Sequence, residues 1–181
     1  MKTRKLAVIS IFGALIIILQ LIASNINISG FPITLTLIPI IIAADIYGEG
    51  IGGLMGLVFG IIVTIMVING TDVGGAAMFS QHPFITVGIC LSKGFLCGYV
   101  AGLVFKALKD KNQRLALILS GICAPIVNTF ILYLGLILFF DSSFKVMIGA
   151  FISINFVIEL LINGLLSPGL LGLINRYTKR K

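Results

Sequence analysis

Residues 82–105, HPFITVGICLSKGFLCGYVAGLVF, form an apolar stretch with a lysine near its middle, and this stretch decides the fold. A helix of about 20 predominantly apolar residues crosses the hydrocarbon core of a bilayer. A charged side chain at the centre of such a helix costs about 2.5–3.5 kcal/mol on insertion scales. Lys93 is therefore a candidate functional residue. The question for the rest of the sequence is which group its charge faces.

The composition of the whole chain places it in a bilayer. Of its 181 residues, 59% are hydrophobic and 10% are charged. Soluble domains are about 45–50% apolar and about 25% charged. At about 20 residues per span, the length allows six or seven crossings and leaves almost nothing for a soluble domain. We expect one membrane domain over residues 1–181, an all-α bundle of six transmembrane helices.

The apolar segments give that count. The first follows MKTRK and, because further apolar segments follow it, we interpret it as an uncleaved span rather than a secretory signal. The second is short and contains Pro39, which favours a kinked helix or one buried by its neighbours. The predicted spans are Leu6–Ser24, Leu35–Tyr47, Gly50–Ile68, Pro83–Leu108, Leu115–Phe140 and Phe144–Ile174.

The positive charges predict the orientation. The formal net charge is +7, and the basic residues gather at the N-terminus, in 106–114 and in the C-terminal tail. Cytoplasmic loops carry the excess of Lys and Arg. Both termini and the main loop 106–114 are thus predicted to be cytoplasmic, with loops 25–34, 69–83 and 140–144 outside. The charge is a topology signal that needs no nucleic-acid partner, and we expect a multi-pass protein of a prokaryotic plasma membrane.

Polar residues within the spans predict a pocket. They are Gln20, Lys93, Asn128, Asn155, Glu159 and Asn163, and the last three, spaced by four, share one helix face. At 1.5 Å per residue, Lys93 and Asn155 lie about 15–16 Å from the external ends of their spans, Asn128 about 18 Å and Glu159 about 22 Å. Spans four, five and six are therefore expected to share a polar pocket.

Two interpretations of Lys93 remain open at this stage. It forms a structural ion pair with Glu159, or it faces a cavity and binds the anionic group of a small solute. In the second case Asn128 and Asn155 supply hydrogen bonds, as the few polar groups of an apolar ligand site do. Glu159 as a proton-coupling site is a third option. His82, in the external loop, is a capping residue or a contact for an entering ligand.

Small residues recur on three predicted helices. Spacing of four places Gly52, Gly56 and Gly60 on one face, and the same holds for Gly94, Gly98 and Gly102. Such faces let helix backbones approach closely where lipid gives no hydrophobic drive to pack. The small face of the first span is either internal packing or a docking surface for another membrane protein; it consists of Ala7, Ser10 and Ala14.

Catalytic and metal-binding motifs are missing from the sequence. It contains no GxxxxGK[ST] phosphate loop, no HExxH and no GxSxG. Its three cysteines lie inside apolar runs without a CxxC or a Cys/His pairing. We therefore expect neither an enzyme nor a protein that holds a metal or cofactor.

Three stretches resemble a known family. FPITLTLIPIIIAADIYGEGIGGLMGLVFGI (31–61) is similar to the substrate-binding S components of energy-coupling factor (ECF) vitamin transporters. SKGFLCGYVAGLVFKAL (92–108) and APIVNTFILYLGLILFF (124–140) resemble the pantothenate-type members in particular. The resemblance covers nearly the whole chain.

The resemblance implies a function and partners. S components bind a vitamin from outside in a pocket of spans four to six, capped by the loop between spans one and two. They dock on a transmembrane coupling subunit with two cytoplasmic ATPase subunits, which use the ATP, partly through an AxxxA-type motif on span one. Here Ser10 replaces the first alanine and Ala14 matches the second.

The substrate expected from the resemblance is pantothenate. Its carboxylate suits a buried lysine flanked by asparagines, although niacin, biotin and folate also carry carboxylates. Riboflavin, a further candidate, would give Lys93 no such partner. The alternative from another class is an autonomous small-solute carrier that couples to protons through Glu159.

Overall fold

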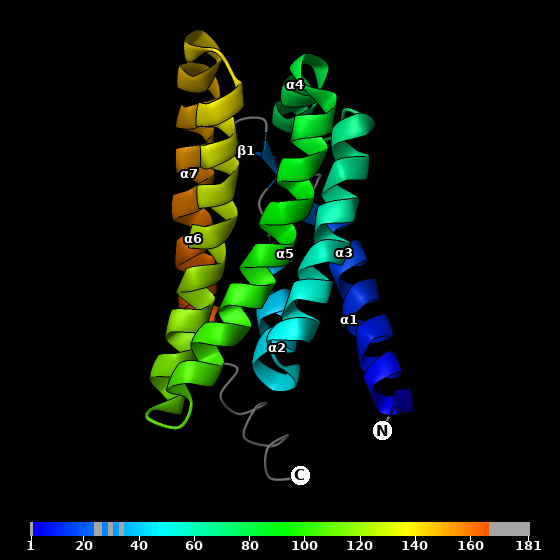
Figure 1. Ribbon diagram of the computed structural model, residues 1–181, viewed down its shortest axis with the longest axis vertical. Helices are drawn as coiled ribbons and strands as arrows, with labels where there is room; N and C mark the ends of the chain where they lie inside the picture. The colour runs from blue at the N-terminus through cyan, green and yellow to red at the C-terminus, as the bar shows by residue number, and fades with distance from the viewer. Residues whose placement is uncertain (1, 24–26, 29–30, 33–34, 167–181) are drawn as a thin grey trace.

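The computed structural model describes residues 2–23, 27–28, 31–32 and 35–166. These residues have the predicted all-helical fold, apart from one hairpin of two two-residue strands (Figure 1). In the hairpin, β1 pairs with β2 in antiparallel register, with Ile28 opposite Phe31. The elements are α1 (Lys2–Ala23), β1 (Asn27–Ile28), β2 (Phe31–Pro32), α2 (Leu37–Tyr47), α3 (Glu49–Ile68), α4 (Val73–Gln81), α5 (Pro83–Leu108), α6 (Gln113–Phe139) and α7 (Ser142–Leu166).

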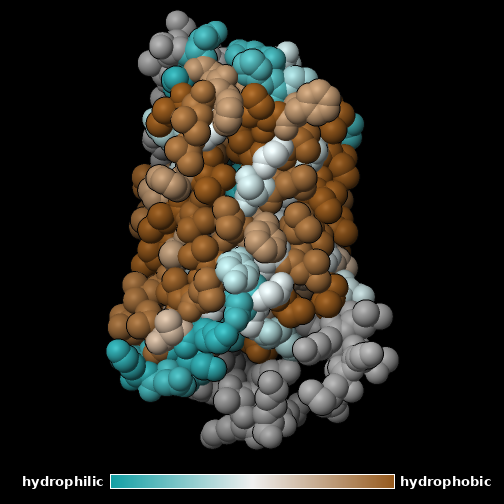
Figure 2. Space-filling view, viewed as in Figure 1, coloured by the Kyte–Doolittle hydropathy of each residue, from teal (hydrophilic) through white to brown (hydrophobic). Residues whose placement is uncertain are grey.

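Three of these helices are long and apolar enough to cross a membrane. They are α3, α5 and α6. Shorter apolar helical segments lie in α1, α2 and α7, at Ile9–Ala23, Leu37–Tyr47 and Ile154–Leu166. Figure 2 shows hydrophobic residues around the middle of the visible face and hydrophilic residues toward its two ends. These helices and the apolar middle of the visible face are typical of a helical membrane protein.

The contact between α3 and α5 confirms the predicted role of the glycines. A Cβ atom added to Gly60 would lie 2.7 Å from the carbonyl oxygen of Cys90, and one added to Gly52 would lie 2.5 Å from that of Gly98. Gly56 and Gly94 are closer still, each facing the other's backbone oxygen. No other residue type fits here, because real Cβ atoms do not come within 3.0 Å of backbone atoms. We call this contact the glycine seam.

Helix α5 lies at the centre of the bundle, between α3 and α6, with α7 packed on α6 (Figure 1). The core gathers around the glycine seam and includes buried residues of α2, α3 and α5 such as Ile40, Met55, Phe59 and Cys97. At one end of α5, Glu49 and Lys106 join α3 to α5 through an ion pair of 2.6 Å. Side chains on the face of α5 that points into the bundle are consequently surrounded by the other helices.

The two ends of the bundle differ. The start of α1, the α2–α3 turn and the α5–α6 connection lie at one end, whereas α4 and the α6–α7 connection lie at the other (Figure 1). Strand β2 contacts both α4 and α7. The N-terminal basic segment and the basic connection 106–114 are thus on the same side of the molecule.

Two of the predicted external loops contain secondary structure. Segment 69–83, expected to be a loop, contains α4, because the Asp72 carboxylate caps the helix by accepting a hydrogen bond from the Gly75 N–H at 2.9 Å. The buried Met78 holds α4 against the bundle. Segment 25–34, also expected to be a loop, contains β1 and β2. The last span was predicted to reach Ile174, and its portion beyond Leu166 lies outside the described residues.

The glycine seam makes the first prediction. Gly94→Ala should lower the free energy of unfolding by about 1–3 kcal/mol, the usual cost of overpacking. The added Cβ would meet the Gly56 carbonyl oxygen and lie 3.1 Å from Gly60 Cα. Thermal unfolding in detergent measures the change. Gly88→Ala on the same helix is the control, since nothing lies within 4 Å of its Cβ position. Equal melting temperatures for the two variants would contradict the prediction.

Candidate functional site

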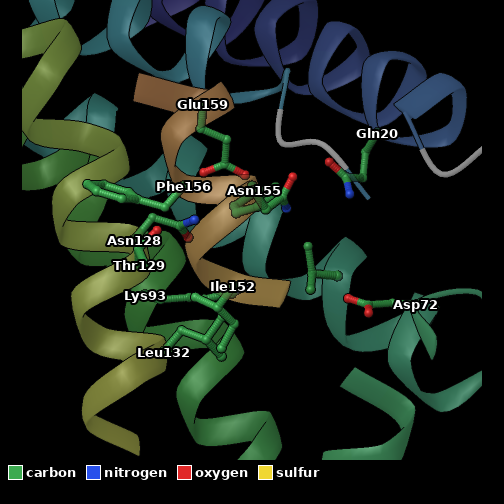
Figure 3. A pocket seen from close by; sticks show the side chains of 12 residues that line it. Gln20, Asp72, Lys93, Asn128, Thr129, Leu132, Ile152, Asn155, Phe156 and Glu159 are labelled. Atoms are coloured by element: carbon green, nitrogen blue, oxygen red, sulfur yellow. The ribbon is translucent and has the colours of Figure 1, made fainter. Parts of the chain in front are cut away.

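A cavity lies where α1, α3, α5, α6 and α7 meet, beside the start of α4 (Figure 3). Its lining combines apolar with polar side chains. The residues are Gln20, Phe59, Val63, Asp72, Lys93, Asn128, Thr129, Leu132, Ile152, Asn155, Phe156 and Glu159. Four predicted site residues from α5, α6 and α7 are among them, so the structure brings Lys93, Asn128, Asn155 and Glu159 together. The expected polar pocket of these three helices is present.

Lys93 is held inside the bundle by its place beside the glycine seam. Its side chain is only 9% exposed, and Nζ lies 5.9 Å from the centre of the Phe59 ring, within range of a cation–π interaction. Among the described residues, Lys106 and Glu49 form an ion pair with a nitrogen–oxygen distance below 4.0 Å. Lys93 has no such partner among these residues. The geometry thus favours the interpretation in which the lysine charge faces a cavity.

Amide and carboxyl groups line the cavity on α6 and α7. Asn155 and Glu159 share one face of α7, as their spacing predicted, and both are buried. One turn further, the Asn163 amide donates a hydrogen bond to the Glu159 backbone oxygen at 2.7 Å. On α6, Asn128 is 4% exposed, and its Oδ1 accepts no hydrogen bond from any described residue. Buried acceptors normally have partners, so Asn128 Oδ1 is a buried acceptor still lacking a partner among the described residues, on a residue that lines the cavity.

Two lining residues with buried polar side chains, Gln20 and Asp72, were missing from the predicted site. Gln20 was recognised as an intramembrane polar residue, but nothing in the sequence placed α1 beside the pocket. It is 1% exposed and accepts a hydrogen bond from the Thr36 hydroxyl at 3.0 Å. Asp72 lay in an expected loop. Its position before VGG, at the cap of an unrecognised helix, was the one sequence signal that could have drawn attention to it.

Burial governs the chemistry of Asp72. The side chain is 5% exposed, and removal from water raises the pKa of its carboxyl. The hydrogen bond from Gly75 and the positive charge of Lys93 both act in the opposite direction on that pKa. The charge of Lys93 therefore acts on the Asp72 carboxyl from a distance, because the two groups do not form an ion pair.

The other predicted residues lie away from the cavity. His82 is exposed at the junction of α4 and α5, with its ring 5.3 Å from that of Phe140. It is not among the lining residues, and its contact with an entering ligand stays a prediction. Ser10 and Ala14 are exposed on α1, which favours the docking interpretation over internal packing for those two positions. The side chain of Ala7 lies outside the described residues.

The cavity is small in this structure. Its volume is about 40 Å³, whereas sites that enclose a drug-sized ligand measure about 300–1,000 Å³. A vitamin can enter only if some of the lining moves outward. No glycine of the seam is among the lining residues, so this movement need not disturb the contact between α3 and α5.

Buried polar side chains from several apolar helices meet at this cavity, an arrangement typical of solute-binding membrane proteins. The sequence profile described as ECF transporter, substrate-specific component, matches residues 4–173, and the chain belongs to this family. It is therefore a transporter subunit rather than an enzyme, with a small-molecule substrate and an ECF module as its partner. No curated protein sequence matched the chain.

Asn128 makes a prediction about the empty site. Asn128→Leu should raise the free energy of unfolding of the ligand-free protein by about 1 kcal/mol, because it removes a buried acceptor that lacks a partner. The same change should weaken substrate binding. Thermal unfolding without ligand tests the first part, and a lower melting temperature would show that Asn128 is satisfied in the empty protein.

Proposed function

We propose that this chain is the substrate-binding subunit of an ATP-driven ECF vitamin importer and that its substrate is pantothenate. The observation that carries the proposal is Lys93, a buried cation without an ion pair among the described residues, in the polar cavity of a member of this family. Substrate enters from the outside and occupies the space between α5, α6 and α7. It passes inward after the subunit docks on its coupling partner.

The chemistry of pantothenate matches the lining. Its carboxylate neutralises Lys93, and charge-assisted hydrogen bonds of this kind are roughly twice as strong as neutral ones. Its amide and hydroxyl groups suit Asn128, Asn155 and Glu159. Nicotinate, biotin and folate also carry a carboxylate, so the similarity of stretches 92–108 and 124–140 to pantothenate-type members ranks pantothenate first. Riboflavin ranks last, since it offers Lys93 no carboxylate.

The proposed topology has six spans, made by α1, α2, α3, α5, α6 and α7, with both termini in the cytoplasm. Two observations support it. The basic start of α1 and the basic connection 106–114 lie at the same end of the bundle (Figure 1). Helix α4 lies at the opposite end (Figure 1), which becomes the external side, and β2 contacts both α4 and α7. The membrane is the plasma membrane of a prokaryote.

The proposed partners are a transmembrane coupling subunit and two cytoplasmic ATPase subunits. The docking face is the small-residue side of α1, where Ser10 and Ala14 are exposed. Small residues allow the close helix approach on which association within lipid depends. ATP is used by the partners, in agreement with the lack of a phosphate loop in this chain.

An autonomous carrier that moves protons through Glu159 is the competing function, because this carboxyl group is 3% exposed and lines the cavity. Reconstitution in liposomes separates the two functions. Uptake by this chain alone, driven by a pH gradient, would favour the carrier. Uptake that requires the coupling subunit, the ATPases and ATP supports the importer.

Binding to a panel of vitamins tests the substrate. Pantothenate, nicotinate, biotin, folate and riboflavin are titrated into the purified chain, by calorimetry or with radioligands since it has no tryptophan. We expect the tightest binding for pantothenate. Lys93→Ala should weaken it about 10- to 100-fold, as expected when a hydrogen bond to a charged group is lost.

The control for Lys93→Ala is Lys145→Ala, which removes a positive charge near the start of α7, away from the cavity lining. It should leave the affinity unchanged. Unchanged affinity in Lys93→Ala would remove the lysine from the site. Preference for riboflavin would retain the family role and overturn pantothenate as the substrate.

Docking is tested by Ala14→Trp. The indole should block close approach at the exposed face of α1, so assembly with the coupling subunit is lost while pantothenate affinity is kept. Co-purification with the ECF module measures assembly. Leu138→Trp, at an exposed apolar position of α6, is the matched control and should assemble normally. Normal assembly of Ala14→Trp would show that α1 is not the docking face.

A further inference from the structure

The cavity has a second polar wall, opposite the helices that carry Lys93 and Asn128. Gln20 reaches it from α1, and Asp72 reaches it from the start of α4 (Figure 3). The Asp72 carboxylate points from the α4 side toward the middle of the cavity, and the Gln20 amide points in from above it. Both side chains are at least nine-tenths buried, at 5% and 1% exposure. We call these two residues the acidic wall.

Backbone contacts hold the Asp72 part of the acidic wall in place. Asp72 Oδ1 accepts from the Gly75 N–H at 2.9 Å, and the Asp72 N–H donates to the Met66 carbonyl oxygen at the end of α3, at 3.3 Å. A Cβ atom at Gly75 would lie 3.1 Å from Asp72 Oδ2, so the glycine leaves room for the carboxylate. These contacts fix the carboxylate before any ligand arrives, which reduces the ordering cost of binding.

The charges of the lining residues indicate which ligand groups the acidic wall can bind. Two carboxyl groups, Asp72 and Glu159, face one ammonium group, Lys93, which gives the described lining a formal charge of −1 when all three are ionised. A ligand with a carboxylate alone would pair with Lys93 and leave the acidic wall facing an apolar or negative surface. Buried carboxylate oxygens that lose water must gain hydrogen bonds in return.

We propose that the acidic wall recognises hydrogen-bond donors of the substrate, hydroxyl or N–H groups, while Lys93 holds an anionic group at its other end. The inference rests on the proposed function and narrows it. Pantothenate has this form, with a carboxylate at one end and two hydroxyl groups at the other. Nicotinate, whose ring nitrogen is an acceptor, is excluded by the same rule.

The test changes the Asp72 carboxylate in the protein and, separately, removes the hydroxyl groups from the ligand. Asp72→Asn keeps an oxygen for the Gly75 N–H but turns an NH₂ group toward the cavity. Asp141→Asn, at an exposed acid between α6 and α7, is the matched control. The ligands are pantothenate and N-(3,3-dimethylbutanoyl)-β-alanine, which retains the carboxylate and the amide but lacks both hydroxyl groups. Dissociation constants of the three proteins for both ligands complete the cycle.

We expect Asp72→Asn to weaken pantothenate binding about 10-fold, the loss of one hydrogen bond to a charged group. The analogue should lose no more than about twofold, since the groups that couple to Asp72 are already absent. Asp141→Asn should change neither affinity. Equal losses for both ligands, or none for pantothenate, would overturn the inference.

Failure of the substrate proposal gives a different result. If the wild-type chain does not bind pantothenate, that proposal falls, and the variants are compared with the panel vitamin that binds most tightly. A loss in Asp72→Asn beyond that in Asp141→Asn then supports the acidic wall, and equal affinities overturn it. Binding of no panel vitamin overturns both.

Discussion

The close approach of two backbones along the glycine seam is the constraint on which the structure depends. It brings α3 against α5 where Gly56 and Gly94 face each other. Lys93 directly precedes Gly94, and Phe59 directly precedes Gly60. Successive residues of a helix point about 100° apart, so both side chains leave the seam on its flank. This is why the lysine lies over the phenyl ring at the edge of the cavity.

Local sequence pattern was sufficient for the features that one helix specifies by itself. The apolar runs located α3 and α5 to within a residue or so, since the length of a span and its hydropathy do not depend on neighbours. Spacing of four placed Asn155 and Glu159 on one face for the same reason. The sequence also predicted that spans four to six would share a pocket, because similar depths in the bilayer leave buried polar groups few places to meet.

Features that depend on pairs of distant segments were not predictable. Gln20 enters the cavity because α1 packs against α2 and α3, and Thr36 then fixes its amide. Asp72 was hidden because VGGAAMFSQ is short and has two glycines in its first turn, which disfavour a helix. The cap can be recognised only once α4 is known. His82 drew attention as the one histidine of the sequence; its ring packs on Phe140 and does not line the cavity, and its contact with an entering ligand stays a prediction.

The separation of the glycine seam from the cavity lining has a consequence for engineering. Because the seam is made of backbone and has no side chains to repack, the position of Lys93 does not depend on which residues occupy the facing walls. Gln20, Asn128 and Asn155 stand on three different helices, α1, α6 and α7. Substrate selectivity can therefore be redesigned by changing the lining residues of one helix at a time, while the contact between α3 and α5 stays the same.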